Sequence, residues 1–264
     1  MTELNKTSGI VAQPEGTYWH FLSEDRCLGY DDGRKVVVGE TLRMDESPIL
    51  CRRGFHASQR AIDAFNFAPG PITCLVTLGG TVLHGRGHAI PDKSVAQERT
   101  VLWAYDASSL LRHFACDVAE EALLAERKAG REPDPQLFAA ISIMRRFIVG
   151  DAEEADRSAA EKSAWSVVPN ETGNSAKNAA HRAAYSAANS TAVCAAWEVA
   201  WSVAMNAAYS AAWSAVNSAS ENSAYSAANS AALSASNDRL TGMLLAAMVQ
   251  GEGDFPPSSA QELV

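Results

Sequence analysis

Three short stretches in the first half of the chain carry residues whose types could do chemistry. The first is TYWHFL, which contains His20; the second is CRRGFHAS at 51–58; and the third is the Gln-Glu-Arg stretch around Glu98. Histidine and glutamate are among the side chains that most often bind or protonate a substrate. Each stretch also has a purely structural explanation, as a half-buried histidine, a glycine turn before a capped helix, and a surface charge pair. Taken singly, these residues leave catalysis and packing both open.

Other catalytic and metal-binding patterns are weak or absent. His84 and His88 are four residues apart, but the glycines between them predict a loop and no cluster of acidic or thiol partners accompanies them. The LGG and GRG segments are too sparse for a phosphate-binding fingerprint. The sequence contains no GxSxG motif. We therefore predict no metal site and no required cofactor.

The elements that would position His20, His56 and Glu98 lie between residues 17 and 106. Short β-rich runs alternate there with the turn signals DDGR, APGP and LGG. One helix is predicted within this set, with Ser58 as its N-cap and an end at Pro69 and Gly70. This region therefore predicts a small α+β domain with a mostly antiparallel sheet.

From Asp106 onward the pattern becomes helical. Asp106 is a good N-cap and Gly130 a natural C-cap for a first helix. A second helix is predicted from the run PQLFAAISIMRRFIVG, ending at Gly150, and a third from DAEEADRSAAEKSAWSVV, ending at Pro169. Residues 107–150 thus form a helical connector.

The most regular feature of the chain is a four-residue repeat. Fourteen tetrads such as AAYS, AANS and AAWS run in one frame from Ala183 to Asp238. Alanine has the highest helix propensity, so this region is predicted to be helical, and its aromatic row to be a packing surface. Either one long rod or an antiparallel hairpin turning at 216–223 fits the pattern. Small residues on the other rows favour close helix packing, and we expect a homo-oligomer through this region.

Bulk properties narrow the class of protein further. The formal net charge is −9 and the pI about 5.2, so the protein as a whole has no positive electrostatic field to attract nucleic acid, and we expect no nucleic-acid partner. Five widely spaced cysteines without a CxxC pair indicate a reducing compartment. No secretory signal and no run of 18 apolar residues is present. We expect a cytoplasmic protein that does not enter a membrane.

In chain order, the three stretches resemble the ADP-ribosyltransferases of the poly-ADP-ribose polymerase and diphtheria-toxin type. GFHASQRAIDAF followed by PITCLVTLGG is similar to their second conserved block, Trp19-His20 to the first, and Glu98 with the strand ending Tyr105-Asp106 to the last. The resemblance implies that NAD is a substrate and that the catalytic residues are His20, His56 and Glu98. It also implies that the nucleotide-binding residues are His20, Gly54, Phe55, His56 and Ser58.

The roles implied by this resemblance are specific, and so are the departures from it. Glu98 would hydrogen-bond the ribose and stabilise the charge that develops as nicotinamide leaves, His20 would anchor a ribose hydroxyl, and His56 would flank the nicotinamide. The family continues its first histidine with Gly-Ser or Gly-Thr, whereas Phe-Leu-Ser follows His20 here. The stacking tyrosine of the family is replaced by His56. An altered pocket of this kind would bind a nucleotide without transferring ADP-ribose.

A second resemblance covers roughly residues 17–235. The pattern C-x-x-G-[FL]-H-A-S, a Leu-Gly strand, an LW-x-x-D strand and AAWS-like tetrads resembles a family of uncharacterised phage and prophage proteins. It implies a phage-type accessory protein in the host cytosol, with a host protein as its target.

The sequence as a whole therefore predicts an α+β protein. The expected parts are a flexible leader (1–16), an ADP-ribosyltransferase-like domain (17–106), a helical connector (107–150), a tetrad-repeat region (151–250) and a flexible tail (251–264). The predicted function is binding of NAD or a related nucleotide, with transfer of ADP-ribose as the catalytic version. The alternative is a non-enzymatic interaction or assembly protein with a self-associating helical tail.

Overall fold

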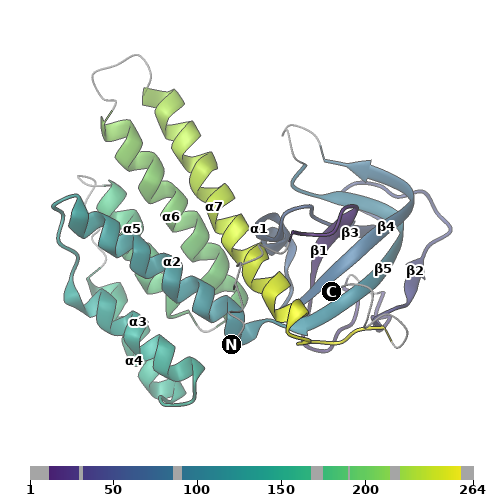
Figure 1. Cartoon of the computed structure of the whole chain (residues 1–264), viewed down its shortest axis with the longest axis horizontal. Coiled ribbons are helices and arrows are strands. Elements are labelled where there is room, and N and C mark those ends of the chain that lie inside the picture. The colour runs from purple at the N-terminus through teal and green to yellow at the C-terminus, as the bar shows by residue number, and fades with distance from the viewer. Residues whose placement is uncertain are drawn as a thin grey trace, which may run out of the picture.

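A computed structural model describes residues 12–29, 32–85, 91–167, 175–189, 191–214 and 221–256. An antiparallel sheet formed by the N-terminal part lies beside a group of helices formed by the rest of the chain (Figure 1). The predicted α+β class is confirmed.

The sheet is built around two long strands, β4 (Ile72–His84) and β5 (Ser94–Asp106), which pair with each other over most of their length. β1 (Thr17–Leu22) pairs with the first half of β4. The short strands β2 (Thr41–Arg43) and β3 (Phe55–Ala57) both pair with β5. All of these pairings are antiparallel, as the short β-rich runs of the sequence predict.

The sheet curls so that its first and third strands meet. Ser58, directly after β3, exchanges two backbone hydrogen bonds with Trp19 of β1, at 2.7 and 2.9 Å. β1, β4, β5 and β3 are therefore joined in a nearly closed ring, with β2 further along β5. The inner face of this sheet is covered by Leu22, Leu42, Phe55, Cys74, Val76 and Val101, all of them buried.

The helix predicted to begin at Ser58 is shorter than expected. The structure has α1 (Ala61–Ala64) followed by a 3-10 turn, η1 (Phe65–Phe67). Ser58 does not cap this helix, because its backbone is used in the pairing with Trp19 and Arg60 occupies the N-cap position without a side-chain bond. The prediction of Ser58 as an N-cap was therefore wrong.

The predicted helices after Asp106 are confirmed as α2 (Ser108–Lys128), α3 (Pro135–Ile148) and α4 (Glu154–Ser166). The Asp106 carboxylate accepts the Ser108 backbone N–H at 3.0 Å. Asp134 caps α3 by accepting from the Gln136 backbone. Gly130 and Gly150 have the positive φ angles, 77° and 81°, that end helices in the left-handed conformation. The proposed stop at Pro169 lies outside the described residues.

The tetrad region folds into three helices, α5 (Ser175–Ala187), α6 (Ala192–Ser214) and α7 (Glu221–Val249). α6 and α7 pack side by side as an antiparallel pair, so the hairpin, and not the rod, is realised (Figure 1). Residues 215–220, which contain much of the predicted turn, lie outside the described part of the chain. The break between α5 and α6 was not predicted from the sequence.

Many alanines of α5 and α6 are buried inside this chain, whereas Ala227 and Ala231 of α7 are exposed. α6 packs against α2, α5 and α7, and its residues Ala195, Ala196, Val199 and Ala200 are fully buried in the larger apolar core. Trp19, Phe21, Leu75 and Trp103 bring the outer face of the sheet into the same core. The close packing expected of small residues is thus observed within one molecule for α5 and α6, and oligomer formation remains a prediction.

The segment after α7 returns to the sheet. Asp254 exchanges two backbone hydrogen bonds with Ala104 of β5, and the Trp103 indole donates to the Glu252 carbonyl at 2.7 Å. An ion pair joins Arg26 to Asp254. At Gly253 a Cβ would lie 2.6 Å from the Ala104 oxygen, so the close approach requires glycine. Residues 251–256, which the sequence suggested were part of a flexible tail, are therefore held against β5.

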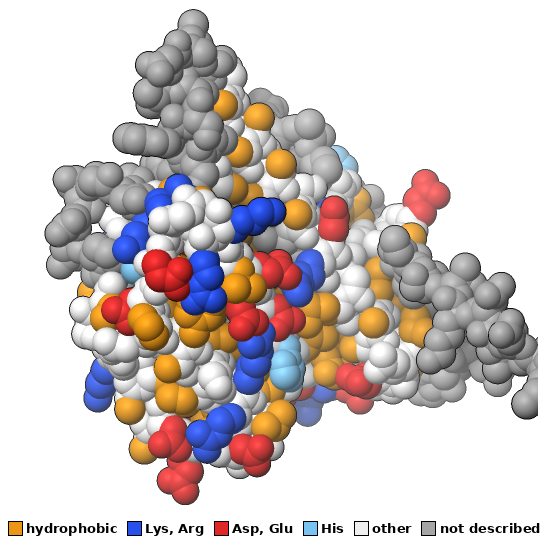
Figure 2. Space-filling model, turned by 60° about the vertical axis from the view of Figure 1, so that its left-hand side comes forward, with side chains coloured by type: hydrophobic (Ala, Val, Ile, Leu, Met, Phe, Trp, Pro, Cys, Tyr) orange, Lys and Arg blue, Asp and Glu red, His pale blue; other side chains and the backbone are white. Residues whose placement is uncertain are grey.

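The molecular surface carries charges of both signs. Acidic and basic side chains are interspersed on the face of the helical region seen in Figure 2, without a large area of one sign. Among the ion pairs between helices, Arg145 of α3 binds Asp117 and Glu120 of α2, at 3.0 and 2.7 Å. Among the helices described, none combines the length and the apolar character that a membrane crossing requires.

Candidate functional site

A polar cluster lies on the inner face of the curled sheet. His20 on β1 is opposite Cys74 on β4, and Arg99 on β5 is opposite Leu78 on β4 and Leu42 on β2. Because side chains alternate between the faces of a strand, this register places His20 and Arg99 among the inner apolar side chains. The fold therefore brings a histidine and an arginine from two separate strands into one apolar surrounding.

Arg99 is the centre of this cluster. Only 1% of its surface is exposed, yet its Nη1 alone has a hydrogen-bond acceptor, the His56 carbonyl at 3.0 Å. Its Nε and Nη2 have no hydrogen-bond partner among the described residues. The Phe55 ring lies 5.5 Å from the Arg99 guanidinium carbon, as a cation–π contact. Burial lowers the pKa of Arg99 to about 10, so the side chain is still charged at neutral pH.

Both predicted histidines lie close enough to Arg99 to interact with its charge. His20 is partly exposed and hydrogen-bonds with the His56 backbone, and burial, followed by the charges of Arg99 and His56, holds its pKa well below the usual value. The His56 ring accepts the Cys51 backbone N–H at Nε2, at 3.2 Å, so its Nδ1 carries the proton and faces the Gly54 carbonyl at 3.1 Å. Burial also lowers the pKa of His56. Both rings are therefore neutral at physiological pH.

Glu98 does not join the histidines. It precedes Arg99 directly on β5, so its side chain points to the opposite face of the sheet. There its carboxylate pairs with Arg43 of β2 at 3.2 Å, beside Gly79. The structure therefore brings together His20 and His56, whereas the Glu98 carboxylate is bound to Arg43 on the side of β5 opposite to Arg99.

The other predicted nucleotide-binding residues, Gly54, Phe55 and Ser58, take part in packing or strand pairing. A Cβ on Gly54, where φ is +120°, would lie 2.6 Å from the Val95 side chain, so this glycine permits close packing of the chain on β5. Phe55 is buried, with the guanidinium carbons of both Arg34 and Arg99 at 5.5 Å from its ring. Ser58 is buried and pairs with β1. Of these three, Phe55 contacts Arg99 through its ring and Gly54 contacts the His56 ring through its carbonyl.

Arg99 was missed by sequence reasoning, although a signal was present. In SVAQERTVLWAYD, positions 95, 97, 99 and 101 share one face, and valines stand at two of them. A charged residue on an apolar strand face is unusual, because burying it costs several kcal/mol when it is unpaired. The motif comparison selected the neighbouring Glu98 instead.

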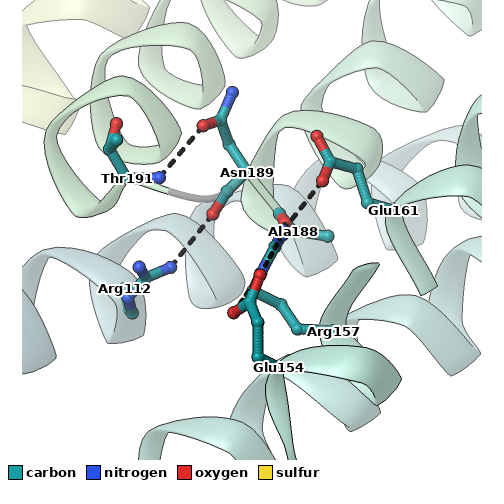
Figure 3. Close-up of polar contacts among 7 residues, drawn as sticks. All are labelled: Arg112, Glu154, Arg157, Glu161, Ala188, Asn189 and Thr191. Carbon is teal, nitrogen blue, oxygen red and sulfur yellow. Dashed lines mark hydrogen bonds and ion pairs between the residues drawn. The ribbon is translucent and has the colours of Figure 1, made fainter. Parts of the chain in front are cut away.

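A second concentration of polar contacts lies at the turn between α5 and α6 (Figure 3). Arg157 of α4 donates to the Ala188 carbonyl and also pairs with Glu154 and Glu161, at 2.7 and 2.8 Å. From α2, Arg112 donates to the Asn189 carbonyl at 3.0 Å. Two arginines thus bind carbonyls that the end of α5 leaves without helical partners. This arrangement stabilises the turn and needs no ligand.

Metal ligation finds no support in the part of the chain that the structure describes. No group of three or more histidine, cysteine or carboxylate side chains lies close enough to hold an ion there. The His84 ring is 2.8 Å from the Ser94 hydroxyl, and His88 falls outside the described residues. All five cysteines are free thiols.

We compared the chain with protein-family models, curated proteins and solved structures, and none of them matched it. The resemblances to ADP-ribosyltransferases and to phage proteins therefore remain predictions from short motifs.

Proposed function

We propose that the N-terminal sheet domain binds a nucleotide-type ligand on its inner face and does not transfer ADP-ribose. The observation that carries the proposal is the convergence of His20, His56 and Arg99 from three strands, while Glu98 lies on the other face. The His20 ring hydrogen-bonds with the His56 backbone through one nitrogen, and its second nitrogen can bond a ribose hydroxyl or a base edge, whereas both nitrogens of the His56 ring are bound by the Cys51 and Gly54 backbone. Small-molecule sites carry a few convergent polar groups among apolar side chains, and this face combines them in the same way.

Loss of the transferase step follows from the position of Glu98. The step needs a carboxylate within hydrogen-bond reach of the ribose whose glycosidic bond breaks. In this sheet the Glu98 carboxylate is bound to Arg43, and the backbone of β5 separates it from the histidines. Binding without turnover is the version of the predicted function that this geometry favours.

The experiment measures binding and NAD consumption on the full chain. We expect NAD or ADP-ribose to raise the melting temperature of wild type and of Glu98→Gln equally, and to raise that of His20→Gln less. NAD consumption should stay at the level of a heat-denatured sample in both wild type and Glu98→Gln. Turnover that depends on Glu98 would restore the transferase interpretation, and a melting temperature that no nucleotide changes would end the binding proposal.

Self-association through the helical region is a second candidate, favoured by one observation. Trp201 of α6 is 47% exposed, and its ring lies 6.2 Å from that of Trp197. Glu198 is the one charged residue in α6, so this tryptophan stands on a helix with little charge. Light scattering of wild type and Trp201→Ser would test the idea, with Trp165→Ser, an exposed tryptophan on α4, as the matched control. A monomeric wild type would end it.

A further inference from the structure

The two nitrogens of Arg99 that lack a partner are adjacent on one edge of the guanidinium. Nε and Nη2 carry two parallel N–H bonds, and this edge matches the two oxygens of a phosphate or carboxylate. The third nitrogen, Nη1, is held by the His56 carbonyl at 3.0 Å. The protein therefore fixes one end of the side chain and leaves the bidentate edge without an acceptor.

No described carboxylate is placed to fill that edge. Asp32 is the one carboxylate that interacts electrostatically with Arg99, but its oxygens are bound to Arg34 at 2.7 and 2.8 Å. Cys74, also near Arg99, is a neutral thiol because burial raises its pKa to about 12. The histidines that contact Arg99 are neutral as well. The inner face thus holds one positive charge that its described neighbours leave uncompensated.

Burying the Arg99 charge without an anionic partner lowers the free energy of unfolding, so a function for this charge is to be sought. A buried charge without a partner destabilises a fold by several kcal/mol. A receptor for an anion is one setting in which the charge is used, because the bound anion then supplies the missing partner and the missing hydrogen bonds. His20 and His56 are partly exposed, so the cluster reaches the protein surface on their side.

We propose that the Nε–Nη2 edge of Arg99 binds the phosphate group of a nucleotide whose sugar or base lies against His20, His56 and Phe55. This inference rests on the proposed nucleotide binding and adds to it the residue and the chemical group that give the ligand its charge.

Calorimetric titration of the full chain with AMP, ADP-ribose, adenosine and inorganic phosphate tests this assignment. The variant is Arg99→Lys, which keeps the charge but removes the two-bond fork. The matched control is Arg43→Gln, an arginine of the same sheet on the opposite face. We expect AMP to bind wild type at least tenfold more tightly than adenosine does, Arg99→Lys to lose at least tenfold in AMP affinity, and Arg43→Gln to match wild type.

Folding of the variant is checked separately, and the outcomes are distinct. Circular dichroism of Arg99→Lys and Arg99→Met establishes that they fold. The melting temperature of wild type should rise with phosphate concentration, and that of the folded variants should not. Equal binding of AMP and adenosine, or equal AMP affinity of wild type and Arg99→Lys, would overturn the phosphate assignment and leave nucleotide binding standing. Absence of binding by all four compounds would overturn both.

Discussion

The contact between Arg157 and the end of α5 makes a quantitative prediction about stability. The Arg157 side chain is 4% exposed, and the Ala188 carbonyl that it binds belongs to a residue that is 1% exposed. Arg157→Ala removes a hydrogen bond from a charged group, worth about 1.5–3 kcal/mol, and leaves the carbonyl buried without its donor. A favourable charge at a helix C-terminus adds about 0.5 kcal/mol. We expect the free energy of unfolding to fall by about 3 kcal/mol.

Urea denaturation followed by circular dichroism measures this loss as a shift of the midpoint at constant slope. The matched control is Arg127→Ala, because Arg127 is 48% exposed and its pair with Glu132 at 2.9 Å should contribute only about 0–1 kcal/mol. Hydrogen exchange should also become faster at the first turn of α6 in Arg157→Ala, since the turn loses its anchor. Equal midpoints for the two variants would refute the role assigned to Arg157.

Three further predictions concern the sheet and the segment that returns to it. Gly54→Ala should cost about 3 kcal/mol, because a Cβ would lie 2.6 Å from the Val95 side chain at a φ of +120°, whereas Gly29→Ala, with open space around it, should change the unfolding midpoint little. The folded-state pKa of His20 is lowered, so its stabilising contribution is complete above the unfolded pKa of about 6.5 and is lost as the pH falls below it; His20→Gln should therefore flatten the decline of stability from pH 6.5 to pH 5. Deleting 251–264 removes the bonds of Glu252 and Asp254 to β5 and should lower the melting temperature by several degrees, and deleting only 257–264 should leave it unchanged if those bonds are the cause.

The sequence predicted the helical region well wherever a cap or a glycine marked a boundary. It failed at the turn between α5 and α6 for a clear reason. AAYSAANS at 183–190 leads to the end of α5 at Ala187, whereas the nearly identical SAYSAANS at 223–230 lies within α7. Local propensity cannot separate the two copies. Arg112 and Arg157, which come from other helices, bind carbonyls at the first copy, so tertiary contacts help to fix the break there.

Two residues of the polar cluster on the inner face were named from the sequence, and the third, Arg99, was not. His20 and His56 were identified from their types and positions, and the fold does place them together. Glu98 was chosen by motif likeness, but its neighbour Arg99 is the residue of β5 that faces inward, and the Glu98 carboxylate is bound to Arg43. Which face of β5 is the inner one depends on the curl that joins Ser58 to Trp19, and this pairing between distant residues has no local signal.

The hydrogen bond from Trp103 to Glu252 also has a consequence for the order of folding. Its partners are 149 positions apart, so β5 gains this contact only after α2–α7 have been synthesised. Contacts between such distant residues carry a large loop-closure entropy and form late. In a nascent chain that has emerged only as far as α6, β5 therefore lacks the hydrogen bonds of Trp103 and Ala104 to the segment after α7. We expect the sheet and the helices to reach their final state together, as a single cooperative unit, once α7 has docked.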